Sequence, residues 1–235
     1  MKMPSPTFQA RLAQLLLGAW LVLGLSGLFA PRAPSLLVGL GHDLLALIAV
    51  LVIALVIGVP LGALAGSGPR WLDTTLAFVT DWIAAVPVVL LLAFLRPAGV
   101  SHFGGLLLLG LLRALEVGWV VRSALLRAAR LDTTWAARSL GYMPLAVFLS
   151  QRLPAAARPA LAHLALTPVW TFLLDSIGSA GGLGAASSPR SLGAQVVTSA
   201  HGDGGRAALA VLAVVSATWA LHRLGNHYGL RLARK

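Results

Sequence analysis

Apolar positions along the chain gather into long runs, and polar positions are mostly confined to the stretches between them. Six runs stand out, at residues 12–30, 44–66, 76–95, 103–121, 159–177 and 207–221. A helix needs about 20 apolar residues to cross the roughly 30 Å hydrocarbon layer of a membrane. Lipid offers the backbone no hydrogen-bond partner, so spanning segments of this kind are helices. The pattern predicts an all-α, polytopic membrane protein with six transmembrane helices.

Composition supports a membrane protein and excludes an ordinary soluble domain. Of 235 residues, 58% are hydrophobic and 11% are charged, and the mean hydropathy is +0.86. Soluble domains carry about 25% charged residues. The net charge of +11 would indicate nucleic acid in a soluble protein. Here most basic residues lie between or after the apolar runs, so we expect the lipid bilayer, and not nucleic acid, as the partner.

The arginines predict which loops face the cytoplasm. With the N-terminus inside, the inside loops and the C-terminal tail carry most of the basic residues, and each outside loop carries one or two. By the positive-inside rule, both termini are cytoplasmic and the chain lies in the cell's inner or plasma membrane. The run at 12–30 has a second interpretation as a cleaved signal peptide. Its length favours an uncleaved anchor.

The inside loop at residues 122–158 is far longer than the others and mixes basic and apolar positions. Arginines alternate with leucines at near-helical spacing, which is typical of a helix lying at the membrane surface. Thr133 or Thr134 can cap a short helix that begins at Trp135. Gly141 can end that helix by adopting a positive φ, and Pro154 suits the start of the next span. The loop could dock a partner or merely anchor itself to the membrane.

The loop's spacing carries a resemblance to a known family. From Trp135 it reads W-A-A-x3-G-x9-Q-x-L-P, which resembles the E-A-A-x3-G-x9-I-x-L-P loop of ABC importer permeases. Further stretches resemble, in the same order, the dipeptide, oligopeptide and nickel permeases of the second-subunit type, over roughly residues 36–200. They are G-V-P-L-G-A-L-A-G (58–66) with Trp71-Leu72-Asp73, D-W-I-A-A-V-P (81–87), and Asp175-Ser176 with G-G-L-G (181–184) and S-P-R-S (188–191).

The resemblance implies a type I ABC importer permease-like bundle. Residues 1–235 would form a single transmembrane permease domain, with a first span at 12–30, a five-helix core at 36–221 and a cytoplasmic coupling loop at 122–158. The chain would not be an enzyme; its implied partners are a homologous second permease subunit, cytoplasmic ABC ATPase subunits and an extracytoplasmic solute-binding protein for peptides or nickel-type complexes. The implied coupling residues are Trp135, Ala136, Ala137, Arg138, Gly141, Leu153 and Pro154.

Two departures from the family pattern keep another reading open. Trp135 replaces the family's loop glutamate, and an indole cannot make the ionic contact of a carboxylate. The family stretch before the second span is reduced to Gly41-His42-Asp43. A permease-derived membrane scaffold or accessory subunit that no longer transports is therefore the alternative.

Charged residues within the apolar runs are candidates for a translocation pathway or a subunit interface. Arg113 and Glu116 are three residues apart, so they share a helix face and can pair. Charges inside a membrane are costly and face protein or water. Pro87 can bend its helix, and Asp81 and Asp175 lie near span ends. A packing role is equally open for Arg113 and Glu116. For Asp81 a partly solvated position near the cytoplasmic boundary is favoured, and Asp175 is either a gate residue or merely interfacial.

Neither a cofactor nor a metal is expected. The chain has no cysteine, its six histidines are scattered, and it lacks the G-x4-G-K-[ST] phosphate loop. An intramembrane enzyme would need a nucleophile and a base on facing spans. The available residues, Ser26, Ser150, Ser176, His163 and Asp175, do not form a recognisable set.

Overall fold

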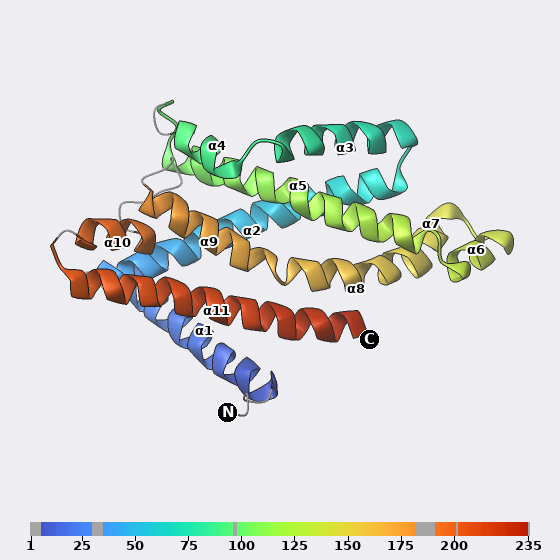
Figure 1. The fold of residues 1–235 in the computed structure, drawn as a ribbon. Helices are drawn as coiled ribbons and strands as arrows, with labels where there is room; N and C mark the ends of the chain where they lie inside the picture. Colours follow the sequence, from blue (N-terminus) through green and yellow to red (C-terminus); the bar gives the residue numbers. More distant parts are fainter. Residues whose placement is uncertain (1–5, 30–34, 96–97, 182–190, 201, 235) are drawn as a thin grey trace.

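The structure, a computed structural model, describes residues 6–29, 35–95, 98–181, 191–200 and 202–234, and this part of the chain is helical with no strand. Its long helices run side by side in an elongated bundle (Figure 1). Four are long and apolar enough to cross a membrane: α1 (Pro6–Phe29), α2 (Ser35–Ser67), α5 (His102–Ala128) and α11 (Gly204–Arg234). They contain the first, second, fourth and sixth predicted spans.

The other two predicted spans are broken, so the expected count of six is not reached. Residues 76–95 divide into α3 (Arg70–Ala84) and α4 (Val88–Leu95), because Pro87 has no N–H to donate and disfavours helix in the residue before it. The fifth run divides into α8 (Leu153–Leu164) and α9 (Thr167–Ala180). Together with the segment before α8 they qualify, by length and composition, as one candidate span bent by 40°, so the described residues contain four candidate spans, or five with this pair.

Helical structure occupies much of the predicted coupling loop at residues 122–158. The last turns of α5 reach Ala128, and α8 begins at Leu153. Between them lie α6 (Asp132–Ser139), α7 (Pro144–Val147) and the π-helical turn η1 (Phe148–Arg152). The C-terminal helix also passes its predicted end at 221 and runs to Arg234.

Glycines bring α2 and α5 close together at the centre of the bundle. Gly58, Gly62 and Gly66 repeat every four residues along the face of α2 that meets α5. A methyl group on Gly58 would overlap the carbonyl oxygen of Ala114, and one on Gly62 would overlap that of Gly118. Small residues at this spacing allow backbones to approach, which drives helix association in membranes. This pair is the most extensive helix contact of the fold.

A second group of helices packs around the first half of α2. Helices α1, α9 and α11 and the short α10 (Leu192–Ala200) surround a cluster in which Leu40, Phe172 and Leu192 are almost fully buried. The outward faces of the helices carry exposed apolar side chains such as Leu15, Val56 and Val215. These faces are suited to contact lipid.

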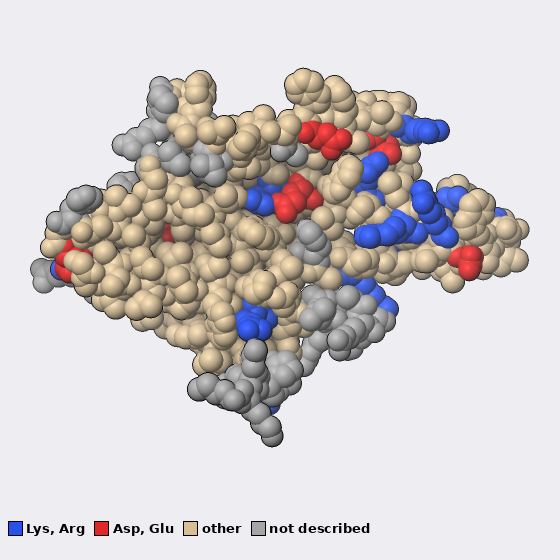
Figure 2. All heavy atoms as spheres, viewed as in Figure 1, with Lys and Arg blue, Asp and Glu red and all other residues tan. Residues whose placement is uncertain are grey.

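One end of the bundle differs from the rest of the surface. There α2 turns into α3, and α6 and α7 project beyond the long helices (Figure 1). Figure 2 shows arginine side chains gathered at this end, with few on the long flank. The chain places at this end Arg70, Arg122, Arg127, Arg130, Arg138, Arg152 and Arg158. We call it the basic end.

Candidate functional site

Helix α6 begins earlier in the chain than predicted, and it lacks the predicted threonine cap. Its first residue is Asp132, and Leu131 at the N-cap position makes no side-chain cap. Neither Thr133 nor Thr134 caps a helix starting at Trp135, so that prediction is wrong. The Thr134 side chain is fully buried, and its hydroxyl donates to the carbonyl oxygen of Ala128 at 2.9 Å. This bond ties α6 to the end of α5.

The end of α6 agrees with the prediction for Gly141, which adopts a φ of +79°. The Gly141 N–H donates to the Arg138 carbonyl at 3.0 Å, and the Tyr142 N–H donates to the Ala137 carbonyl at 3.2 Å. These paired bonds form a Schellman motif, which requires a left-handed residue at this position. The chain therefore reverses sharply between α6 and α7.

This turn leaves an apolar surface exposed at the tip of the basic end. Its members are more than half exposed although large and apolar: Trp135, Leu140, Tyr142, Met143 and Leu145. We call this set the α6–α7 surface. Ala136 and Arg138 are also exposed and lie beside it, and Ala137 is half-buried. A contiguous apolar surface at a polar end of a molecule marks an interaction site.

Arg152 connects this surface to the bundle. Its side chain is 9% exposed, and its Nη2 donates to the Gly66 carbonyl at the end of α2 at 2.7 Å. The guanidinium also lies 5.8 Å from the centre of the Phe148 ring. Because Arg152 belongs to η1, which continues directly into α8, α7 and α8 behave as one helical arm fixed to α2.

Leu153 and Pro154 lie on this arm and not on the α6–α7 surface. The Leu153 N–H donates to the carbonyl of Phe148, five residues earlier, which closes the π turn. Pro154 follows inside a continuous helical run, where a proline ring would normally clash with the preceding turn. A widened π turn relieves that crowding. The sequence placed Pro154 at the start of a span; it lies at the second residue of α8, after η1.

Arg113 and Glu116 form the ion pair that their spacing predicted, on α5. Their side chains are 12% and 39% exposed. Asp81, exposed on α3, lines the same cavity of about 370 Å³ between α3, α4 and α5. Pro87 lies in the break that separates α3 from α4. The structure thus brings three of the predicted charged residues together, and Pro87 positions the helices around them.

Asp175 is not part of that cavity. It lies on α9, where it is 6% exposed, and its Oδ1 has no hydrogen-bond partner. Its neighbour is Asp43 on α2, whose Oδ2 accepts from the Leu192 N–H at 3.0 Å. Asp43 thereby caps the first turn of α10, a favourable place for a negative charge. Asp175 therefore belongs to the helix packing at the other end of the bundle.

Asp73 and Arg122 form an ion pair that joins α3 to α5 and that the sequence patterns did not predict. Arg122 Nη2 lies 2.9 Å from Asp73 Oδ2, and Arg122 Nε donates to Asp73 Oδ1. The Arg122 hydrogen bonds lower the pKa of Asp73 below its usual range. The guanidinium also lies 4.7 Å from the Trp119 ring centre. Asp73 is the sole acid between the second and third apolar runs, and that isolation was the available signal.

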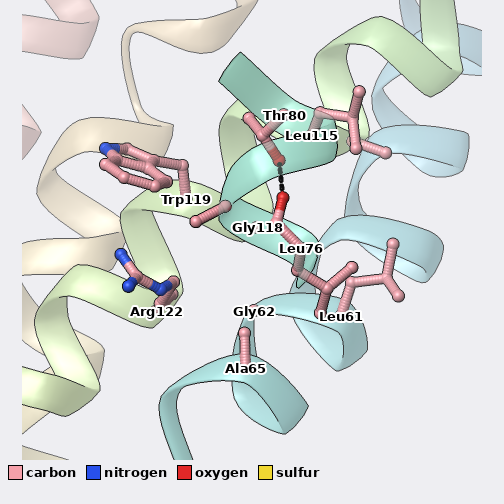
Figure 3. Close-up of a pocket in the computed structure, with 11 residues that line it drawn as sticks. Leu61, Gly62, Ala65, Leu76, Thr80, Leu115, Gly118, Trp119 and Arg122 are labelled. Carbon is pink, nitrogen blue, oxygen red and sulfur yellow. Dashed lines mark hydrogen bonds between the residues drawn. The ribbon is translucent and has the colours of Figure 1, made fainter. Parts of the chain in front are cut away.

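Above this ion pair a narrow crevice separates α2, α3 and α5. Figure 3 shows Trp119 and Arg122 of α5 on one side of it, Leu76 and Thr80 of α3 above, and Gly62 and Ala65 of α2 below. Trp119 and Thr80 also line the larger cavity, so the two hollows adjoin. Within the described residues no group of three histidines and acids could hold a metal ion.

Comparisons with known proteins agree with this architecture. Residues 58–233 match the family of binding-protein-dependent transport system inner membrane components. A solved structure titled "Inward facing conformations of the MetNI methionine ABC transporter" is similar, with a TM-score of 0.67 and 19% sequence identity. The alignment covers 84% of this chain and 96% of that chain. At this identity the likeness shows the fold alone. A search of curated proteins found no match.

Proposed function

Because the chain belongs to the family of binding-protein-dependent transport system inner membrane components, we propose that it moves solute inward by coupling the motion of a separate ATPase to alternating access. Membership makes it a non-enzymatic, multi-pass membrane component of an ABC importer. Such importers work with ATPase subunits, a second permease and a solute-binding protein. The particular partners of this chain, and the surfaces through which they bind it, are part of this proposal.

The observation that carries the proposal is the α6–α7 surface. Five large apolar side chains are exposed there, at a basic end that the positive-inside rule predicts to face the cytoplasm. A groove on a cytoplasmic ATPase would cover them, with Ala136 and Ala137 allowing close approach. An apolar groove suits the indole of Trp135, which stands where the family has a glutamate. The positive-inside rule agrees, since it places the basic end and both termini in the cytoplasm.

The mechanism follows from how this surface is attached. ATP-driven closure of two ATPase subunits would displace α6 and α7, and α8 with its Arg152–Gly66 contact would pass the displacement to α2. Two permease halves would then rock as rigid bodies between outward-open and inward-open states. The difference between the two states in the binding free energy of surface and groove sets how strongly the two events are coupled. Peptides or nickel-type complexes are the proposed solutes, on the resemblance of the motifs alone.

A crosslinking experiment tests the coupling, because the chain has no cysteine of its own. Arg138→Cys should form a disulfide with a cysteine placed in the groove of the candidate ATPase, in membranes, and ATP should change the yield. Thr198→Cys, exposed on α10 at the other end of the bundle, is the matched control and should not react. Equal yields from both variants would contradict the docking.

The alternative is a permease-derived scaffold that assembles without transporting. It is favoured by the replacement of the loop glutamate with Trp135. In that case the second permease would still co-purify with this chain, while Arg138→Cys would give no nucleotide-dependent crosslink. The same experiment therefore separates the two functions.

A further inference from the structure

The cavity between α3, α4 and α5 combines apolar walls with charged side chains. Its volume is about 370 Å³, and Ile83, Val86, Leu109, Leu112 and Leu115 supply much of its lining. A lining of this kind, with a few convergent polar groups, is typical of small-molecule sites. Charged groups beside a membrane interior face protein or water and are a sign of function.

The charges that line the cavity do not balance. Arg113 is paired with Glu116, while Asp81 on the opposite wall makes no ion pair among the described residues. The three side chains together leave one excess negative charge. A cavity with low-dielectric walls concentrates ions of opposite charge. The lining therefore favours a cation over an anion or a neutral molecule.

A second feature narrows the kind of cation. Arg113 Nε is buried and has no hydrogen-bond partner, although its side chain lines the cavity. A buried N–H donor that makes no hydrogen bond destabilises the protein. An acceptor oxygen on a bound molecule would satisfy it. The walls of Leu and Val side chains also suit alkyl groups better than a hydrated metal ion.

We propose that this cavity is a binding site for an organic ammonium solute that also carries an acceptor oxygen. The ammonium group lies between Asp81 and Glu116, the oxygen accepts from Arg113 Nε, and the carbon skeleton contacts the apolar walls. The proposal rests on the proposed transport function, because the site would hold the solute during its passage. Of the solutes proposed above, peptides carry both groups and metal complexes do not, so metal complexes are ranked lower.

Charge-selective labelling of a single cysteine tests the site in membranes. Leu112→Cys lies in the lining, one helical turn before Glu116. It should react faster with cationic trimethylammonioethyl methanethiosulfonate than with anionic sulfonatoethyl methanethiosulfonate, by about tenfold for one excess charge. Leu145→Cys, exposed on the α6–α7 surface, gives the ratio outside the cavity. Choline should slow labelling of Leu112→Cys, and its uncharged isostere dimethylbutanol should not.

Neutralising variants show whether the preference comes from these carboxylates. On the Leu112→Cys chain, Asp81→Asn or Glu116→Gln should each remove the preference, and the double variant should reverse it. A cationic-to-anionic rate ratio no higher than that of Leu145→Cys, no reaction with either reagent, or a ratio that Asp81→Asn leaves unchanged would each overturn the proposal. The Arg138→Cys crosslink is independent of this result. A crosslink with no charge preference leaves the coupled permease intact without this site.

Discussion

Among the polar contacts that join helices in the described part of the bundle are three that involve a charged side chain. Asp73 binds Arg122 between α3 and α5, Arg152 binds the Gly66 carbonyl between η1 and α2, and Asp43 binds the Leu192 N–H between α2 and α10. Each contact joins helices that otherwise meet mainly through apolar side chains. Apolar contacts are non-directional, so the hydrogen bonds fix how these helices are positioned. Removal of one partner leaves the other unsatisfied, which costs more than the bond contributes.

The Asp73–Arg122 pair should make stability depend on pH. The pKa of Asp73 is lowered in the folded protein. The pair's contribution to the free energy of unfolding is therefore complete above the unfolded pKa of about 4, and it is lost as pH falls through the lowered folded pKa. Asp73→Asn should cost roughly 1–2 kcal/mol at pH 7. Melting followed by tryptophan fluorescence in detergent, from pH 7 to pH 3, should show the two proteins converge at the acid end. A constant difference over that range would contradict the assignment to this carboxylate.

At the scale of elements, the distance between α2 and α5 depends on residues that have no side chain. Gly58 and Gly62 face backbone carbonyls of α5, so any side chain would need the helices to move apart. The two helices also carry Arg122, Arg113 and the crevice of Figure 3, so their separation sets the shape of the candidate site. Packing and site geometry are thus determined by the same interface.

Gly62→Val should separate these helices. Overpacking of a tight interface costs about 1–3 kcal/mol, and the melting temperature in detergent should fall accordingly. Gly18→Val on α1, where a side chain would meet nothing within 4 Å, is the matched control and should melt like the parent. If both variants melt alike, close packing at Gly62 is not what holds the pair together.

Local signals in the sequence were sufficient for the features that depend on local physics. Uninterrupted apolar runs predicted α1, α2, α5 and α11, spacing predicted the Arg113–Glu116 pair, and Gly141 predicted the end of α6. Features that depend on distant partners were missed. The hydrogen bond from Leu192 to Asp43 joins residues 149 apart, and Thr134 bonds back to α5 in place of capping α6.

The whole molecule has an apolar flank and two unlike ends. The basic end carries the arginines and the exposed α6–α7 surface (Figures 1 and 2). At the other end Asp43 of α2 and Asp175 of α9 are buried, and α10 packs against both helices. This asymmetry is what a transport subunit needs if its energy comes from one side of the membrane. Trp135 is exposed at the tip of the basic end, so it adds little to the packing of the bundle and is available to a partner.

Trp135→Ala should therefore weaken assembly without weakening the fold. The indole is 59% exposed, and loss of a central interface tryptophan costs about 2 kcal/mol or more, roughly a thirtyfold drop in affinity. Trp71→Ala is the control, because Trp71 is 68% exposed on α3 and lies outside the α6–α7 surface. Titration of the candidate ATPase onto the chain in nanodiscs measures both. Equal affinities for the two variants would exclude Trp135 from the contact.

The bond from Arg152 to the Gly66 carbonyl has a mechanical consequence. A flexible loop would absorb a push on α6 by bending, and little work would reach the membrane. Here the arm of α7, η1 and α8 is continuous helix, and Arg152 fixes it to the end of α2 close to the point of force. If a partner displaces α6, as proposed, the arm would act as a short lever that pivots at Gly66, and its stiffness would set the fraction of the displacement that reaches α2.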